Sequence, residues 1–178
     1  MKKHKILLIV VCVVFALATL CACMSDDLEG RIKVIEKTSA QAKTVTKKLT
    51  IQDGETVVYS LESVADASSD GYNVTKTETA LNDSFEMATT TETATAQSLS
   101  IIHLTTENVF ACTIEDNNMS CIILKENVAN VLELSNNYVP NGVCDLQCVF
   151  ENEKIASISC SFVTENNHTV TYLYTFSY

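Results

Sequence analysis

Cysteine is the residue type in this chain with the most chemistry to offer, since the 178 residues include eight cysteines. Five of them, at positions 112, 121, 144, 148 and 160, lie in the C-terminal half. A cysteine sulfur can form a disulfide, bind a metal ion or act as a nucleophile. Outside the cytoplasm, thiols at this density are typical of disulfides. The strands that carry these cysteines therefore have to be placed first.

The first pair of cysteines falls in a predicted hairpin over residues 109–124. With Asp116-Asn117 as a two-residue turn, Cys112 faces Cys121, Ile114 faces Met119 and Phe110 faces Ile123. By alternation from the turn, Cys112 and Cys121 form a non-hydrogen-bonded pair, whose Cα atoms approach to about 4.5 Å. Disulfides need roughly 4.4 to 6.8 Å. We predict a Cys112–Cys121 disulfide, with free thiols packed as small apolar side chains as the alternative.

A second predicted hairpin covers residues 144–162. Aligning its apolar faces requires a three-residue loop, 151–153, and places Cys144 opposite Cys160. We therefore predict a second disulfide, Cys144–Cys160, and leave Cys148 as an unpaired thiol. An unpaired thiol beside a disulfide also raises the hypothesis of a redox role for Cys148.

No other motif in the sequence indicates catalysis. There is no nucleophile elbow, phosphate loop or zinc-protease helix. The cysteines form no C-x2-C knuckle, and spacing nominates no partner for His103 or His168. We expect no catalytic residues, no metal site and no cofactor, and hence a protein that is not an enzyme. The net charge of −10 argues against nucleic acid as a partner, because nucleic-acid binding needs basic surface.

The N-terminus reads as an export signal. A basic head at residues 2–5 precedes an apolar run over residues 6–20, and LCAC follows at residues 20–23. LCAC resembles the lipobox of bacterial lipoproteins, a resemblance limited to residues 1–23. It implies that residues 1–22 are a cleaved signal peptide and that Cys23 carries a diacylglyceryl thioether. The protein would then be held at the cell membrane, facing the extracytoplasmic side. Ordinary secretion and an uncleaved membrane anchor remain the alternatives.

The rest of the chain reads mainly as strands. Alternating runs joined at Asp53-Gly54, Asp70-Gly71 and Asn82-Asp83 predict hairpins. Residues 125–134 have the apolar spacing of an amphipathic helix. Residues 96–105 fit either a helix or a buried strand.

We predict an α+β fold, a meandering antiparallel sheet of about eight strands, curved or half-barrel, with one or two helices packed on it. The sheet domain spans residues 47–178, after a lipid tether and a short weak helix over residues 23–46 in which Leu28, Ile32 and Ile35 have helical spacing.

These features favour a membrane-anchored surface lipoprotein with a non-catalytic binding role. Its partner would be an apolar ligand in the concavity of the sheet or a protein of the cell envelope. The alternative is a structural or assembly component of the envelope that acts through sheet edges or surface contacts. Without the three lysines of residues 1–22, the body carries a net charge of −13, so an acidic domain needs a dedicated anchor to stay on an anionic membrane.

Overall fold

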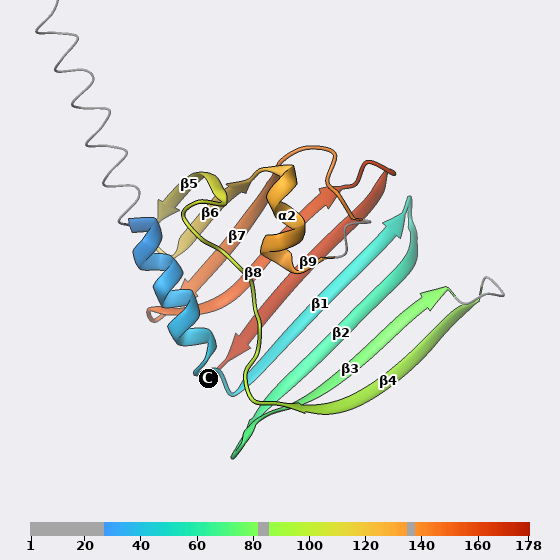
Figure 1. Ribbon diagram of the computed structural model, residues 1–178, viewed down its shortest axis with the longest axis horizontal. Coiled ribbons are helices and arrows are strands. Elements are labelled where there is room, and N and C mark those ends of the chain that lie inside the picture. The colour runs from blue at the N-terminus through green and yellow to red at the C-terminus, as the bar shows by residue number, and fades with distance from the viewer. Residues whose placement is uncertain (1–26, 82–85, 135–137) are drawn as a thin grey trace, which may run out of the picture.

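A computed structural model describes residues 27–81, 86–134 and 138–178; the lipobox-like segment, and Cys23 with it, lies outside these ranges. The described strands form one antiparallel sheet in the order β4-β3-β2-β1-β9-β8-β7-β6-β5 (Figure 1). They are β1 (Thr44–Asp53), β2 (Thr56–Ser68), β3 (Gly71–Leu81), β4 (Met87–Ala96), β5 (Val109–Glu115), β6 (Asn118–Ile123), β7 (Cys144–Glu151), β8 (Lys154–Val163) and β9 (His168–Ser177).

Sequence alternation gives the sheet an inner and an outer face. In β1, Val45, Leu49 and Ile51 are buried, while the residues between them are partly or fully exposed. β9 pairs with β1 in an unbroken register and contributes Val170 and Tyr172 to the same inner face. This is the alternation expected of an antiparallel sheet with one covered face.

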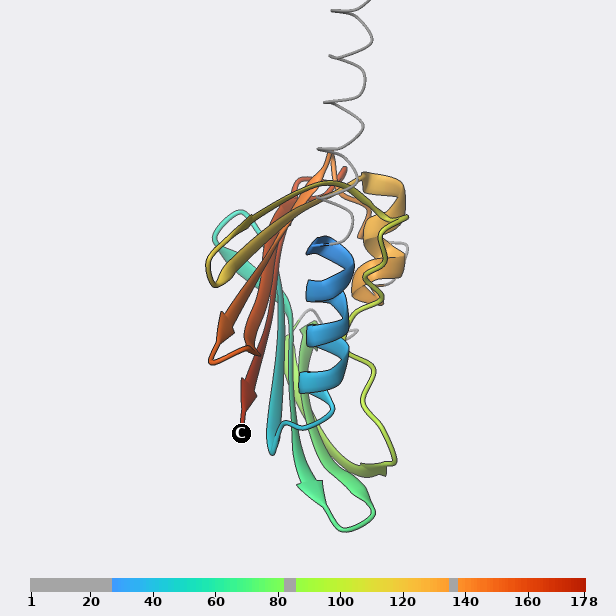
Figure 2. The ribbon, with the colours of Figure 1, turned by 90° about the vertical axis from the view of Figure 1, so that its left-hand side faces the viewer.

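Two helices cover part of the inner face. The first spans residues 27–39 and buries Leu28, Ile32 and Ile35, the residues whose spacing predicted it. The second, α2 (Lys125–Leu132), buries Val128, Val131 and Leu132. Both helices lie on the same side of the sheet (Figure 2). The sheet curves without closing into a barrel, which confirms the predicted α+β curved sheet. No helix in the described ranges is both long enough and apolar enough to span a bilayer.

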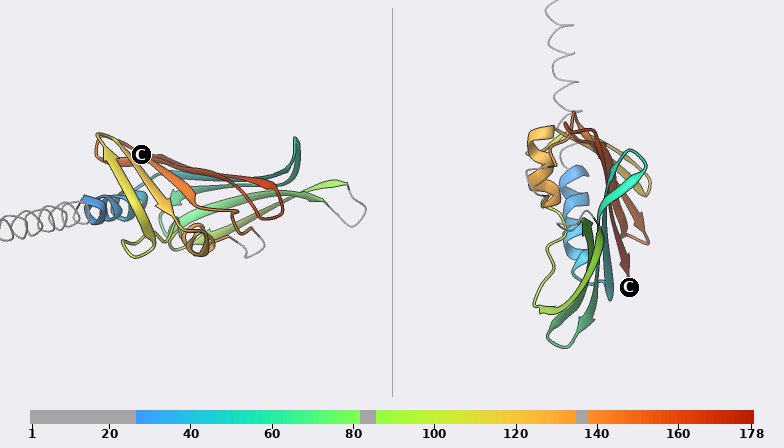
Figure 3. Two further views of the ribbon diagram at one scale, coloured as in Figure 1. Left: turned by 90° about the horizontal axis from the view of Figure 1, so that it is seen from above. Right: turned by 90° about the vertical axis from the view of Figure 1, so that its right-hand side faces the viewer.

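An irregular segment, residues 97–108, connects β4 to β5 and crosses the inner face between them (Figure 3). The sequence of residues 96–105 fits either a helix or a buried strand, but after the end of β4 this segment forms neither. Hydrogen bonds attach this segment to α2 and to β9. The His103 amide donates to the Val131 carbonyl of α2 over 2.9 Å. The Tyr174 hydroxyl donates to the Ser100 carbonyl over 3.3 Å.

The predicted β5–β6 hairpin is confirmed near its turn. Cys112 pairs with Cys121 and Ile114 with Met119 around Asp116, whose φ of 49° matches the positive φ that such turns require. The predicted pairing of Phe110 with Ile123 is wrong, because a bulge lies between residues 109 and 111 and Val109 takes that partner. The Phe110 side chain is left 70% exposed.

The predicted register of the β7–β8 hairpin is wrong. Glu151 pairs with Lys154, so the loop is the two-residue turn Asn152-Glu153, in which both residues have positive φ. This is the geometry of a primed turn, which usually carries glycine at its second position. A bulge beyond the turn then shifts the register again, so that Cys148 pairs with Ile158. Cys144 is therefore not directly opposite Cys160.

Candidate ligand-binding site

The five described cysteines lie on the strands β5 to β8, and all are free thiols in this structure. Cys112 is half-buried and Cys121 fully buried, with their sulfur atoms 3.5 Å apart. Burial raises the pKa of both thiols. The pairing that the sequence predicted is thus present as a contact between two thiols, and the disulfide itself stays a prediction.

Cys144 and Cys160 are also close despite the corrected register. Their buried thiols share a hydrogen bond, which together with burial raises the pKa of Cys160. Cys148 is 1% exposed, and burial raises its pKa to about 12. A thiol so protected is almost entirely protonated at neutral pH, which is the environment of a structural cysteine.

The described residues contain no cluster of three or more histidine, cysteine or acidic side chains placed to hold a metal ion. His103, for which the sequence suggested no partner, lies with its Nε2 3.0 Å from the Glu133 carboxylate. His168 is the first residue of β9.

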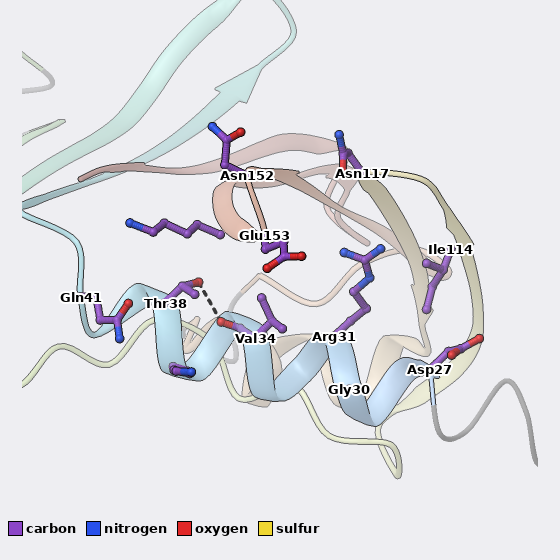
Figure 4. A pocket seen from close by; sticks show the side chains of 12 residues that line it. Asp27, Gly30, Arg31, Val34, Thr38, Gln41, Ile114, Asn117, Asn152 and Glu153 are labelled. Carbon is purple, nitrogen blue, oxygen red and sulfur yellow. Dashed lines mark hydrogen bonds between the residues drawn. The ribbon is translucent and has the colours of Figure 1, made fainter.

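A wide groove of about 960 Å³ lies between the helix of residues 27–39 and the tips of the β5–β6 and β7–β8 hairpins (Figure 4). Its lining mixes both signs of charge. Arg31 rises from the helix toward the hairpin tips, but it already donates to the Asp116 carbonyl over 2.7 Å and lies 4.7 Å from the centre of the Phe150 ring. Because Arg31 is already bound to other residues of the protein, the groove does not favour one class of ligand.

A smaller pocket of about 240 Å³ opens on the inner face of β1, β2 and β3. Its floor is a row of residues paired across strands, in which Tyr174, Lys47, Ser63 and Lys76 are successive neighbours. Residues 99–101 of the crossing segment form the opposite wall. The remaining lining is mainly apolar: Val45, Leu61, Ala65, Leu99 and Ile101.

Lys47 is the distinctive group of this pocket. Burial is the main cause that lowers the pKa of Lys47. The Glu133 carboxylate partly opposes this shift, and the Lys76 ammonium adds to it. Among the described residues, no carboxylate lies within ion-pair distance of Lys47 Nζ. Lys47 Nζ instead lies over the faces of two rings, 5.2 Å from the centre of Tyr172 and 5.6 Å from that of Tyr174.

Lys76, in contrast, is already neutralised. Its Nζ lies 3.0 Å from the Glu78 carboxylate, and it pairs across the strands with Glu92. The pocket therefore holds one ammonium that is paired with a carboxylate and one that is not.

The wall over Lys47 is anchored at the C-terminal end of α2. Glu133, in the left-handed conformation at φ 52°, accepts a hydrogen bond from Ser100 and contacts His103. The Tyr172 hydroxyl donates to the Leu132 carbonyl over 3.2 Å, next to this anchor. The wall over Lys47 is thus held by contacts with the end of α2 and with β9.

An unpaired ammonium in an apolar pocket can bind an anionic group while the walls take an apolar body. Lys47 is not among the site residues predicted from the sequence, although a signal for it is present. In the run TKKLTIQ, residues 47, 49 and 51 share a face, so the alternation that buries Leu49 and Ile51 also turns Lys47 inward.

No family model matches this chain, and no curated protein matches it. Among solved structures, a redesigned β-barrel, mFAP1, bound to DFHBI aligns with 78% of this chain and 98% of its own, at 11% identity and a TM-score of 0.25. At that score the likeness carries no argument about this protein.

Proposed function

We propose that this protein is a non-catalytic binding protein that holds a small amphipathic anion in the pocket over Lys47. The unpaired, half-buried ammonium carries the proposal, because burying a cation without a carboxylate partner is unfavourable unless something compensates it. A ligand carboxylate or similar anion would supply that compensation. The pocket, slightly below the roughly 300 to 1,000 Å³ of common ligand sites, favours a small molecule.

We further propose that the protein acts at the extracytoplasmic face of a bacterial membrane, held by lipid on Cys23. The support is the LCAC pattern after a basic head and an apolar run. Acyl chains contribute about 0.8 kcal/mol for each buried methylene, so two chains hold a domain stably. An acidic body requires such an attachment on an anionic bilayer.

The binding proposal is tested by titrating the full-length protein with sodium hexanoate, hexylamine and hexanol, following the methyl NMR signals of Leu61 and Ile101. Hexanoate should bind most tightly. Lys47→Met should weaken hexanoate about 10- to 100-fold, the range expected when a hydrogen bond to a charged group is lost. Since the anion needs a protonated Lys47, affinity should also fall as the pH rises through the lowered pKa of this lysine.

The matched control is Lys48→Met. Lys48 is the next residue of β1 but points to the outer face, where it pairs with Glu62 over 2.8 Å. It should leave hexanoate binding unchanged. Equal effects of the two substitutions, or equal binding of hexylamine and hexanoate, would overturn the proposed site.

The anchor is tested by mass spectrometry of the N-terminal peptide from protein expressed in a bacterium. An acylated Cys23 as the first residue is expected, and Cys23→Ser should abolish membrane retention whereas Cys21→Ser should not. A mature N-terminus elsewhere, or an unmodified Cys23, would refute lipid anchoring without affecting the pocket.

A further inference from the structure

The two edges of the sheet are unequal. The β5 edge is seven residues long and is interrupted by the bulge between residues 109 and 111. The β4 edge is ten residues long and follows β3 in an unbroken register from Met87 to Ala96. β4 is the first strand in the sheet order, and in the described ranges β3 is the one strand that pairs with it (Figure 1).

β4 also lacks the features by which proteins protect an exposed edge. Such edges usually carry lysine, proline or a bulge. The sequence of β4, MATTTETATA, contains none of these, and Glu92 is its single charge. Every residue from Met87 to Thr95 is exposed, and half of the strand is threonine, which favours the extended conformation.

The same sequence is nearly symmetrical about Thr91. An antiparallel partner of identical sequence, centred there, would place Thr91 opposite Thr91, Thr89 opposite Thr93 and Ala88 opposite Ala94. Glu92 would face Thr90, so no like charges are directly opposed. Each Glu92 also keeps Lys76 of its own β3 as a cross-strand neighbour.

Competing registers are less favourable. A shift by one residue would join the inner face of one copy to the outer face of the other. One neighbouring register that keeps the faces aligned centres on Glu92 and sets the two Glu92 carboxylates directly against each other. The other centres on Thr90 and pairs only residues 87–93, whereas the Thr91-centred register pairs residues 87–95. Charge, face and paired length together therefore favour the Thr91-centred register.

We propose that β4 is a self-association edge, at which two copies pair through antiparallel β4 strands centred on Thr91 and form one continuous sheet. Cross-strand threonine pairs already hold β4 to β3: the Thr79 and Thr89 hydroxyl oxygens are 2.9 Å apart, and those of Thr77 and Thr91 are 3.4 Å apart. The proposed contact repeats this pairing on the free side of β4. A single strand pair is a small interface, so the dimer should be reversible, with a dissociation constant on the order of micromolar.

The register is tested with two double variants of the full-length protein in a mild detergent, by sedimentation velocity over a range of concentrations. In Thr89→Lys with Thr93→Lys, lysines oppose each other across the two-fold axis, and the dimer should be lost. In Thr89→Lys with Thr93→Glu, each lysine faces a glutamate, and the dimer should persist or strengthen. Both variants alter the same exposed positions, which removes differences in folding as an explanation.

Cross-linking gives a second readout. Thr91→Cys should form an interchain disulfide under air, because position 91 faces itself, whereas Thr95→Cys on the same face should not. A monomer at all concentrations, equal behaviour of the two double variants, or equal cross-linking at 91 and 95 would overturn the proposal. None of these results depends on ligand binding at Lys47 or on lipid at Cys23.

Discussion

The thiol of Cys121 lies 3.5 Å from that of Cys112, across neighbouring strands and next to a tight turn. A hydrogen-bonded pair of thiols at this separation needs only a small approach to become a disulfide. The half-buried Cys112 gives an oxidant a route to the pair.

We therefore predict that mild oxidation of the native protein joins Cys112 to Cys121. Peptide mapping by mass spectrometry should find this bridge before any other among the five described cysteines. The short loop that it closes should add roughly 2 to 3 kcal/mol to the free energy of unfolding in urea. Cys112→Ala should remove the oxidation-dependent gain; an unchanged gain in that variant would assign the bridge elsewhere.

Cys148 should be inert in the folded protein. Since burial raises its pKa to about 12, iodoacetamide at neutral pH should modify Cys148 only after unfolding, whereas Cys112 should react first. Labelling with and without urea, read by mass spectrometry, tests this directly. Rapid native labelling of Cys148 would restore the redox hypothesis.

Two glycines should respond to alanine in opposite directions. At Gly71, with φ at 130°, a Cβ would lie 2.2 Å from the Ala96 carbonyl oxygen, so Gly71→Ala should cost more than about 2 kcal/mol of stability. At Gly30, inside the helix of residues 27–39, nothing lies within 4 Å, and Gly30→Ala should add about 0.5 to 1 kcal/mol. Urea unfolding of both variants measures the contrast, and a stabilised Gly71→Ala would contradict the close approach of β3 to the end of β4.

Stability should fall in alkali. Burial raises the pKa of Tyr59 and of Tyr174 to about 12, against about 10 for an unfolded tyrosine. Above pH 10 the unfolded chain loses these protons while the folded protein keeps them, so the free energy of unfolding decreases as the pH rises toward 12. Below pH 10 this contribution is fully present.

The measurement is urea unfolding at a series of pH values, with tyrosinate absorbance recorded on the folded protein. Tyr174→Phe should make the alkaline decline shallower. Full tyrosine ionisation near pH 10 without unfolding would show that these hydroxyls are not protected.

The alternation of apolar and polar residues predicted much of the sheet. In the last two strands, alternation puts Val170, Tyr172 and Tyr174 of β9 on the same face as the apolar residues of β8. They pair with Phe162, Cys160 and Ile158 in that order, because a strand with one buried face has only one register that hides its apolar side chains. Apolar spacing likewise predicted both helices. These are local signals, and they do not depend on which strands later become neighbours.

The β7–β8 register was predicted wrongly because of its turn and the bulge beyond it. Asn152 and Glu153 adopt positive φ without glycine, and the bulge beyond them adds a residue that apolar alignment does not count. Beyond the bulge the displacement is two residues, so Ile158 and Cys160 stay on the predicted inner face. Next to the turn it is one residue, and Ile155 is buried there. The displacement nevertheless changes which cysteines are directly opposed.

By itself, the sequence determined an antiparallel sheet with a buried inner face, helices to cover it and cysteines placed along its strands. Only the tertiary structure decided that Lys47 would be left without a carboxylate. That outcome depends on the pairing of β9 with β1 and on the ion pair between Glu78 and Lys76. It also depends on residues 99–101, which form the wall of the pocket over Lys47. Charge pairing depends on distances between segments far apart in the chain, and no periodicity within one strand encodes those distances.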